Sequence, residues 1–291
     1  MPSENPDDRR QRVFGPLIDF LPTELRLRVV SGVVIGVVAL AMLYWSPGAF
    51  ALLTFLVAAA MSWEWGAIVR GTMPDSGLIV HILTVSAAAI LTAGDMAGLA
   101  IVAAIVGAAV VAVLTMATDR TRLSGAGVLY TALPVVALGW LRSDETLGFL
   151  ATLFVVLAVV ITDIGAFAAG RTIGGPKLWP EISPNKTWSG LIGGISAAAI
   201  AGILFSWLSG TGGALWLAGL GLIVGLVAQG GDLAESALKR HFGRKDSGDL
   251  IPGHGGFMDR MDGLVSASVA AALIGFSIDA FAPARALLYG S

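Results

Sequence analysis

The chain has 291 residues, of which 56% are hydrophobic and only 13% are charged, and its mean hydropathy is +0.82. This balance excludes an ordinary water-soluble globular domain. The absence of cysteine excludes disulfides, iron–sulfur clusters and thiolate catalysis, and the three scattered histidines form no zinc-site pattern. We therefore expect any bound metal to be a hard cation on carboxylate oxygens, such as Mg2+. The 18 basic and 20 acidic residues nearly cancel, and no basic patch predicts a nucleic-acid partner.

The predicted elements are transmembrane helices, because a helix needs about 20 apolar residues to cross the hydrocarbon core of a bilayer. The apolar stretches, in chain order, are 27–45, 48–69, 77–93, 95–116, 123–141, 147–169, 189–210, 213–230 and 263–284. They predict an all-α, polytopic integral membrane protein with about nine spans.

The distribution of Lys and Arg predicts the orientation of these spans, since short cytoplasmic loops retain positive charge. If the N-terminus is cytoplasmic, every Lys and Arg except Arg142 and Arg285 falls on the cytoplasmic side. An odd number of spans then places the C-terminus outside. We expect a multi-pass protein of the cell membrane whose active site faces the cytoplasm.

The polar residues divide the chain into three expected regions. Residues 1–26 form a cytoplasmic N-terminal segment, and residues 27–146 form a transmembrane scaffold with short connections and few ionisable residues. Residues 147–291 carry the two longer polar loops, at 170–188 and 239–262. We expect the catalytic region in this C-terminal half.

The first polar segment of that half begins with Asp163, inside an apolar run. A carboxylate at membrane depth is costly and usually faces a cavity or a partner. Arg171 shares its helical face, and the turn from Ser183 to Thr187 resembles a phosphate clip, with Lys186 as a point charge and the hydroxyls as donors. Capping of the next helix by Thr187 is an alternative explanation of that turn.

The second polar segment follows the eighth predicted span. Asp232, Glu235, Ser236, Lys239 and Arg240 have the spacing that places side chains on one face of a helix. The alternative is a juxtamembrane helix end, with basic anchors and i,i+4 ion pairs. That alternative does not explain Asp232, which lies near membrane depth.

The third polar segment, from Lys245 to Gly263, is rich in glycine, and its backbone amides can approach a phosphate closely. Asp259 and Asp262 are three residues apart and could hold a divalent cation together with Asp232 or Asp246. The groups expected to meet phosphate are Lys245, His254, Arg260 and the amides of Gly255 and Gly256. The alternative is a flexible loop in which Asp262 caps the last span.

Three other polar residues lie in or near spans, and we expect structural roles for them. Glu64 and Asp279 lie near span ends, where they would reach water or lipid headgroups, and His81 lies at a helix start.

The order of residues from Ser236 to Asp262 resembles a known signature. It reads Ser236-x-Leu238-Lys239-Arg240, four residues, Lys245-Asp246-x-Gly248, then Pro252-x-His254-Gly255-Gly256-Phe257-x-Asp259-Arg260-Met261-Asp262. This pattern is similar to that of the phosphatidate cytidylyltransferases, or CDP-diacylglycerol synthases, without a departure in 27 residues. Upstream, Asp163, the Ser183–Thr187 turn and Asp232 are similar to accessory motifs of the same family.

The resemblance implies an all-helical, homodimeric membrane enzyme that joins CTP and phosphatidic acid to give CDP-diacylglycerol and pyrophosphate. It also implies Mg2+, with a monovalent cation such as K+ as a second ion. Asp232 and Asp259 are the expected metal ligands, followed by Asp246 and Asp262. The expected catalytic cations are Lys239, Arg240, Lys245, His254 and Arg260, and the expected substrate-binding residues are Asp163, Arg171, Ser183, Lys186, Thr187, Ser236, Gly255 and Gly256.

Two other classes of function fit parts of the pattern. A transporter would have many spans, but it predicts charges at mid-membrane and interrupted, repeated helices, whereas here the charges gather at one face. A CTP-dependent lipid kinase, or another lipid nucleotidyltransferase, would handle phosphate with similar residues.

Overall fold

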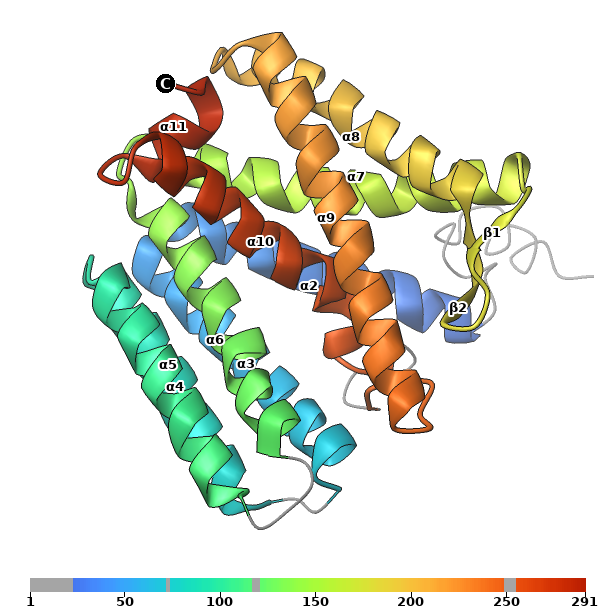
Figure 1. The fold of residues 1–291 in the computed structure, drawn as a ribbon. Helices are drawn as coiled ribbons and strands as arrows, with labels where there is room; N and C mark the ends of the chain where they lie inside the picture. Colours follow the sequence, from blue (N-terminus) through green and yellow to red (C-terminus); the bar gives the residue numbers. More distant parts are fainter. Residues whose placement is uncertain (1–22, 72–73, 117–120, 249–254) are drawn as a thin grey trace, which may run out of the picture.

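The computed structural model describes residues 23–71, 74–116, 121–248 and 255–291, and it is predominantly helical (Figure 1). This confirms the predicted all-α class. The helices are α2 (Thr23–Trp45), α3 (Pro47–Val69), α4 (Ser76–Ala93), α5 (Ala97–Leu114), α6 (Thr121–Ser143), α7 (Gly148–Thr172), α8 (Trp188–Ser209), α9 (Ala214–His241), α10 (Met258–Ile278) and α11 (Pro283–Tyr289).

Within the described ranges, eight helices, α3 to α10, are long and apolar enough to cross a bilayer. The first predicted span corresponds to α2, whose apolar stretch Gly32–Trp45 is shorter. Helix α9 continues to His241, past the predicted end of the eighth span at residue 230, in agreement with the helical spacing of Asp232 to Arg240. The predicted bounds of the ninth span, 263–284, are wrong, because α10 covers Met258–Ile278. Hydropathy marks only the apolar part of a helix, and these helices continue into polar turns that face the site.

A short hairpin replaces the simple turn expected in loop 170–188. Strand β1 (Lys177–Trp179) pairs antiparallel with β2 (Ser183–Thr187), and Figure 1 shows the hairpin beside the ends of α7 and α8. The side chain of Thr187 then caps α8 by accepting a hydrogen bond from the Gly190 amide at 3.1 Å. The capping role considered for Thr187 is therefore confirmed.

Glycines bring α7, α8, α9 and α10 close together. A Cβ atom added at Gly193 would lie 2.2 Å from the Ala169 Cβ, and one at Gly221 would lie 2.4 Å from the Ala198 carbonyl oxygen. Small residues permit such close approach between membrane helices. At Gly231 a Cβ would lie 2.7 Å from the Asp262 carbonyl oxygen, so α9 and α10 touch where their acidic residues begin.

The expected scaffold and catalytic regions pack directly on one another. One buried cluster joins α6 and α7 to α9, α10 and α11, and it includes Leu141, Phe154 and Leu217. Another joins Trp65 of α3 to Met258 at the start of α10. The N-terminal half is therefore in direct contact with the loop that carries the signature.

Candidate active site

A cavity of about 710 Å3 brings together the polar segments of the C-terminal half. It is lined by α7, the β1–β2 hairpin, α8, α9 and α10, and its volume is in the usual range for small-molecule sites. Its charged lining residues are Asp163, Arg171, Lys186, Asp232, Asp259, Arg260 and Asp262. The first and third polar segments, nearly 100 residues apart, therefore face one another across this cavity.

One wall of the cavity is formed by α7. The Asp163 carboxylate accepts a hydrogen bond from the Gln229 side-chain amide of α9 at 3.1 Å, which joins the two helices. About two helical turns after Asp163 on α7, the exposed Arg171 guanidinium lies 5.8 Å from the centre of the Phe167 ring. This places a cation in the lining of the cavity, where it can meet an anionic ligand.

The hairpin is connected to α9 by an ion pair. Lys186 Nζ of β2 lies 2.7 Å from the Asp232 carboxylate, and it also donates to the Gln229 carbonyl oxygen at 3.4 Å. The Ser236 hydroxyl donates to the other oxygen of Asp232 at 3.3 Å. Both charges of the pair are partly buried, so each compensates for part of the lost hydration of the other.

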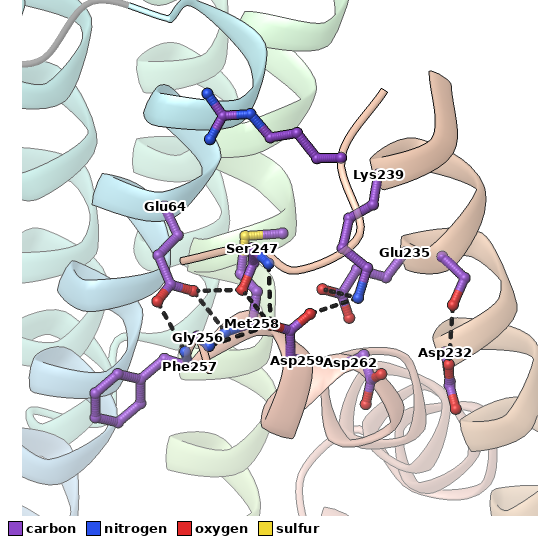
Figure 2. Close-up of polar contacts among 12 residues, drawn as sticks. Glu64, Asp232, Glu235, Lys239, Ser247, Gly256, Phe257, Met258, Asp259 and Asp262 are labelled. Carbon is purple, nitrogen blue, oxygen red and sulfur yellow. Dashed lines mark hydrogen bonds and ion pairs between the residues drawn. The ribbon is translucent and has the colours of Figure 1, made fainter. Parts of the chain in front are cut away.

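Asp259 lies in a more closed environment. It is ion-paired with Lys239, whose ammonium group is also 3.3 Å from Glu235. The other oxygen of Asp259 accepts hydrogen bonds from the Ser247 amide and hydroxyl, both at 2.9 Å, and from the Gly256 amide at 3.1 Å (Figure 2). These contacts fix the Asp259 carboxylate in one orientation.

Asp262 also lines the cavity, one turn further along α10, where its carboxylate accepts the Gly263 amide at 2.7 Å. Since α10 begins at Met258, Asp262 lies in the second turn, and the alternative role as helix cap is wrong. One of the two glycine amides expected to meet phosphate, that of Gly256, is bonded within the protein. Gly255 has a φ of +80°, which favours glycine, and the Gly256 amide donates to Asp259.

Several predicted site residues lie outside the lining of the cavity. Lys245 and Asp246 are exposed on the loop after α9, and Ser183 lies at the start of β2. Arg240 is exposed and donates to the Ile182 carbonyl oxygen at 3.4 Å, so it holds the hairpin. His254 lies outside the described residues.

Three residues that contact the site were not predicted. The expectation that Glu64 reaches water is wrong: it is 1% exposed, and its carboxylate accepts bonds from Ser247, Phe257 and Met258. Ser247 and Gln229 are 1% and 4% exposed. Glu64 and Gln229 could have been selected from the sequence, because each is a polar residue within an apolar span. Nothing in the sequence marked Ser247.

The other two polar residues for which structural roles were expected, Asp279 and His81, lie outside the lining of the cavity. Asp279 accepts the Phe281 amide at 2.8 Å in the turn before α11, and His81 is fully buried in α4.

The cavity lining fits a hard divalent cation in its chemistry, because Asp163, Asp232, Asp259 and Asp262 supply only carboxylate oxygens. Among the described residues, however, no three acidic or imidazole groups are gathered closely enough to hold a metal ion. Lys186 supplies the positive charge at Asp232 instead. A divalent cation would have to compete with this ammonium group or bind beside it.

Sequence comparisons identify the family. The model of the cytidylyltransferase family matches residues 26–277. The chain belongs to this family. It is 36% identical to the phosphatidate cytidylyltransferase of Brucella suis over 253 residues, which cover 87% of this chain and 94% of the relative. The phosphatidate cytidylyltransferase of Staphylococcus saprophyticus is 40% identical over 150 residues, which cover 50% of this chain and 58% of the relative. The family resemblance of the signature is thus confirmed.

Proposed function

We propose that this protein transfers the cytidylyl group of CTP to phosphatidic acid, giving CDP-diacylglycerol and pyrophosphate. Family membership and the names of the relatives support this activity. The structural observation that carries it is the cavity at the ends of apolar helices, where carboxylates face Lys186, Arg171 and Arg260. Such a site can receive a lipid phosphate from the bilayer and a nucleotide from water.

The reaction requires little proton transfer from the protein. A phosphatidate oxygen attacks the α-phosphorus of CTP, the bond from that phosphorus to the bridging oxygen breaks, and pyrophosphate leaves. A phosphate monoester is already ionised near neutral pH, so the protein mainly positions the reactants and compensates their charge.

The residues of the lining divide this work. Arg171, Lys186 and Arg260 all line the cavity, where they can bind phosphate oxygens. Lys239 holds Asp259 in place through its ion pair. Lys245 and Arg240 lie outside the lining, and we propose for them a role in attracting the triphosphate.

Mg2+ is part of the proposal. We propose Asp232, Asp259 and Asp262 as its ligands, because they line the cavity, while Asp246 is exposed outside it; in this structure the three carboxylates are not gathered closely enough to hold one cation together. When bound, the cation would compensate negative charge on the phosphates. The monovalent cation, the homodimer and the absence of a nucleic-acid partner stay predictions from the sequence.

We further propose that the cavity faces the cytoplasm. The basic residues described around it, including Arg171, Lys186 and Arg240, support this orientation, because positive charge is retained on that side.

An assay with positional labels tests this function against a CTP-dependent lipid kinase. The purified protein in detergent is given phosphatidic acid or diacylglycerol, with Mg2+, and CTP labelled at either the α- or the γ-phosphate. We expect α-label in the lipid product from phosphatidic acid. Lipid that carries only γ-label would establish kinase activity instead, and no labelled lipid in any combination would contradict both.

A further inference from the structure

Glu64 contacts the site loop from the N-terminal half of the chain. It lies in α3, and its neighbours Met61 and Trp65 on that helix pack against Met258 at the start of α10. Glu64 is 1% exposed. The carboxylate accepts the Phe257 amide on one oxygen at 2.8 Å and the Met258 amide on the other at 2.8 Å. It therefore satisfies amides at the N-terminus of α10, where the N-cap residue, Phe257, makes no side-chain capping bond.

Ser247 joins Glu64 to Asp259. Its hydroxyl oxygen lies 2.9 Å from one oxygen of Glu64 and 2.9 Å from one oxygen of Asp259, and Figure 2 shows it between the two carboxylates. A hydroxyl has a single hydrogen and donates fully to only one of these acceptors at a time. The same Asp259 oxygen also accepts the backbone amide of Ser247.

The loop is shaped around this arrangement. A Cβ atom at Gly256 would lie 1.9 Å from the Ser247 hydroxyl oxygen and 2.6 Å from a Glu64 oxygen. At Gly248 a Cβ would lie 3.1 Å from the other Glu64 oxygen. Gly256 has no room for a side chain, and at Gly248 a Cβ would press tightly on Glu64, so both glycines of the signature pack against a carboxylate that comes from outside the signature.

We propose that Glu64 is a positioning residue for Asp259. It holds the loop at Ser247 and the first turn of α10, and through them it fixes the direction in which the Asp259 carboxylate enters the cavity. Small displacements of a reacting constellation are costly to rate. The inference rests on the proposed function for its effect on turnover, while the connection itself is a property of the fold.

A double-mutant cycle on Glu64→Gln and Ser247→Ala tests the proposal. Glutamine keeps the volume of Glu64, but it replaces one accepting oxygen by an NH2 group that faces the donors of the loop. Alanine at position 247 removes the hydroxyl that joins the two carboxylates. We expect each single variant to lower kcat by about 10- to 100-fold, as for other residues that orient a reacting group, with little change in KM for phosphatidic acid. The double variant should be no worse than the more severe single variant, because both break one connection.

Ser62→Ala is the matched control on the same helix. Ser62 is fully buried, and its hydroxyl donates to the Ala58 carbonyl oxygen at 2.7 Å and contacts Thr131 of α6, away from the loop. It should lose some stability in detergent but keep wild-type kcat. Wild-type kcat in folded Glu64→Gln or in folded Ser247→Ala would overturn the proposal, and so would a double variant whose loss equals the product of the two single losses.

Hydrogen exchange separates this inference from the proposed reaction. The amides of Phe257 and Met258 should exchange faster in Glu64→Gln than in the wild type or in Ser62→Ala, with no substrate present. If the wild-type protein makes no CDP-diacylglycerol, the proposed function fails, yet this measurement still tests the connection. Unchanged exchange at both amides would overturn the positioning role whatever the substrate.

Discussion

Each of two carboxylates in the cavity is compensated by a lysine from a different part of the chain. Lys186 of the hairpin pairs with Asp232 of α9, and Lys239 of α9 pairs with Asp259 of α10. Buried charges need such partners, because removing one leaves the other without compensation in a poorly solvated site. At this scale the site is a set of paired charges, and the proposed nucleotide and cation would have to fit among them.

Asp232→Asn tests the proposed cation site. Asparagine keeps the shape and the contact with Ser236, but it loses the negative charge that would bind Mg2+. We expect kcat to fall about 100-fold or more, since charge compensation by a metal ion contributes several kcal/mol to the transition state. Turnover is measured on protein that remains folded in detergent.

Asp95→Asn is the control for that substitution. Asp95 is exposed in the turn between α4 and α5, and its φ of 58° is a conformation that asparagine tolerates. Its turnover should stay at the wild-type value. A folded Asp232→Asn protein with turnover equal to this control would remove Asp232 from the metal site.

The β1–β2 hairpin, which lies within the polar loop 170–188, forms part of the cavity wall. It contributes Lys186 and Thr187 to the lining, and Thr187 also caps α8. The hairpin therefore carries a proposed binding group, Lys186, and leads directly into a transmembrane helix.

Lys186→Gln should raise KM for CTP more than it lowers kcat, if the ammonium group binds the triphosphate. Hydrogen bonds to a charged group contribute about 1.5–3 kcal/mol, which corresponds to roughly 10- to 100-fold in KM. Lys177→Gln is the matched control, because Lys177 is exposed in the partner strand and outside the lining. Equal KM values for the two variants would contradict a direct role of Lys186.

The packing of α8 on α9 makes a prediction about stability. Gly221→Ala places a methyl group 2.4 Å from the Ala198 carbonyl oxygen, so the helices must separate, at a cost of about 1–3 kcal/mol. Gly219→Ala, two residues away on α9, has nothing within 4 Å of the new Cβ and should leave stability unchanged or slightly raised. Thermal unfolding in detergent compares the two, and equal midpoints would show that this approach does not limit stability.

At the scale of the whole molecule, the cavity lies where the ends of four helices, α7, α8, α9 and α10, meet. Charged lining residues lie near the C-terminal ends of α7 and α9 and the N-terminal ends of α8 and α10. Alternating spans bring these four ends to the same side, which the positive-inside rule assigns to the cytoplasm.

Single cysteines test this orientation, and the chain offers a background without native cysteine. Lys245→Cys lies on the exposed loop after α9, and Phe281→Cys replaces a side chain that is 98% exposed between α10 and α11. In intact cells whose outer layers have been removed, a membrane-impermeant thiol reagent should label position 281, and position 245 only after permeabilisation. The reverse pattern would place the cavity outside.

Much of the fold and part of the site could be predicted from the sequence. The hydropathy pattern is a local property, so the spans from α3 to α8 were found nearly at their observed positions. Asp163 and Asp232 could be selected because a charge within an apolar run is costly without a partner. The bounds of α10 were missed, since hydropathy marks only the apolar part of a helix and its first turns are polar.

By itself the sequence determined the membrane class, the signature from Ser236 to Asp262 and the family, because each depends on composition or on the order of nearby residues. Only the tertiary structure decided which acids share a cavity, that Lys186 reaches Asp232, and that Glu64 is buried under the loop of Asp259. These contacts join residues from 20 to more than 190 positions apart. They are set by how closely the helices pack, which glycines and neighbouring side chains control together, and no local pattern encodes that distance.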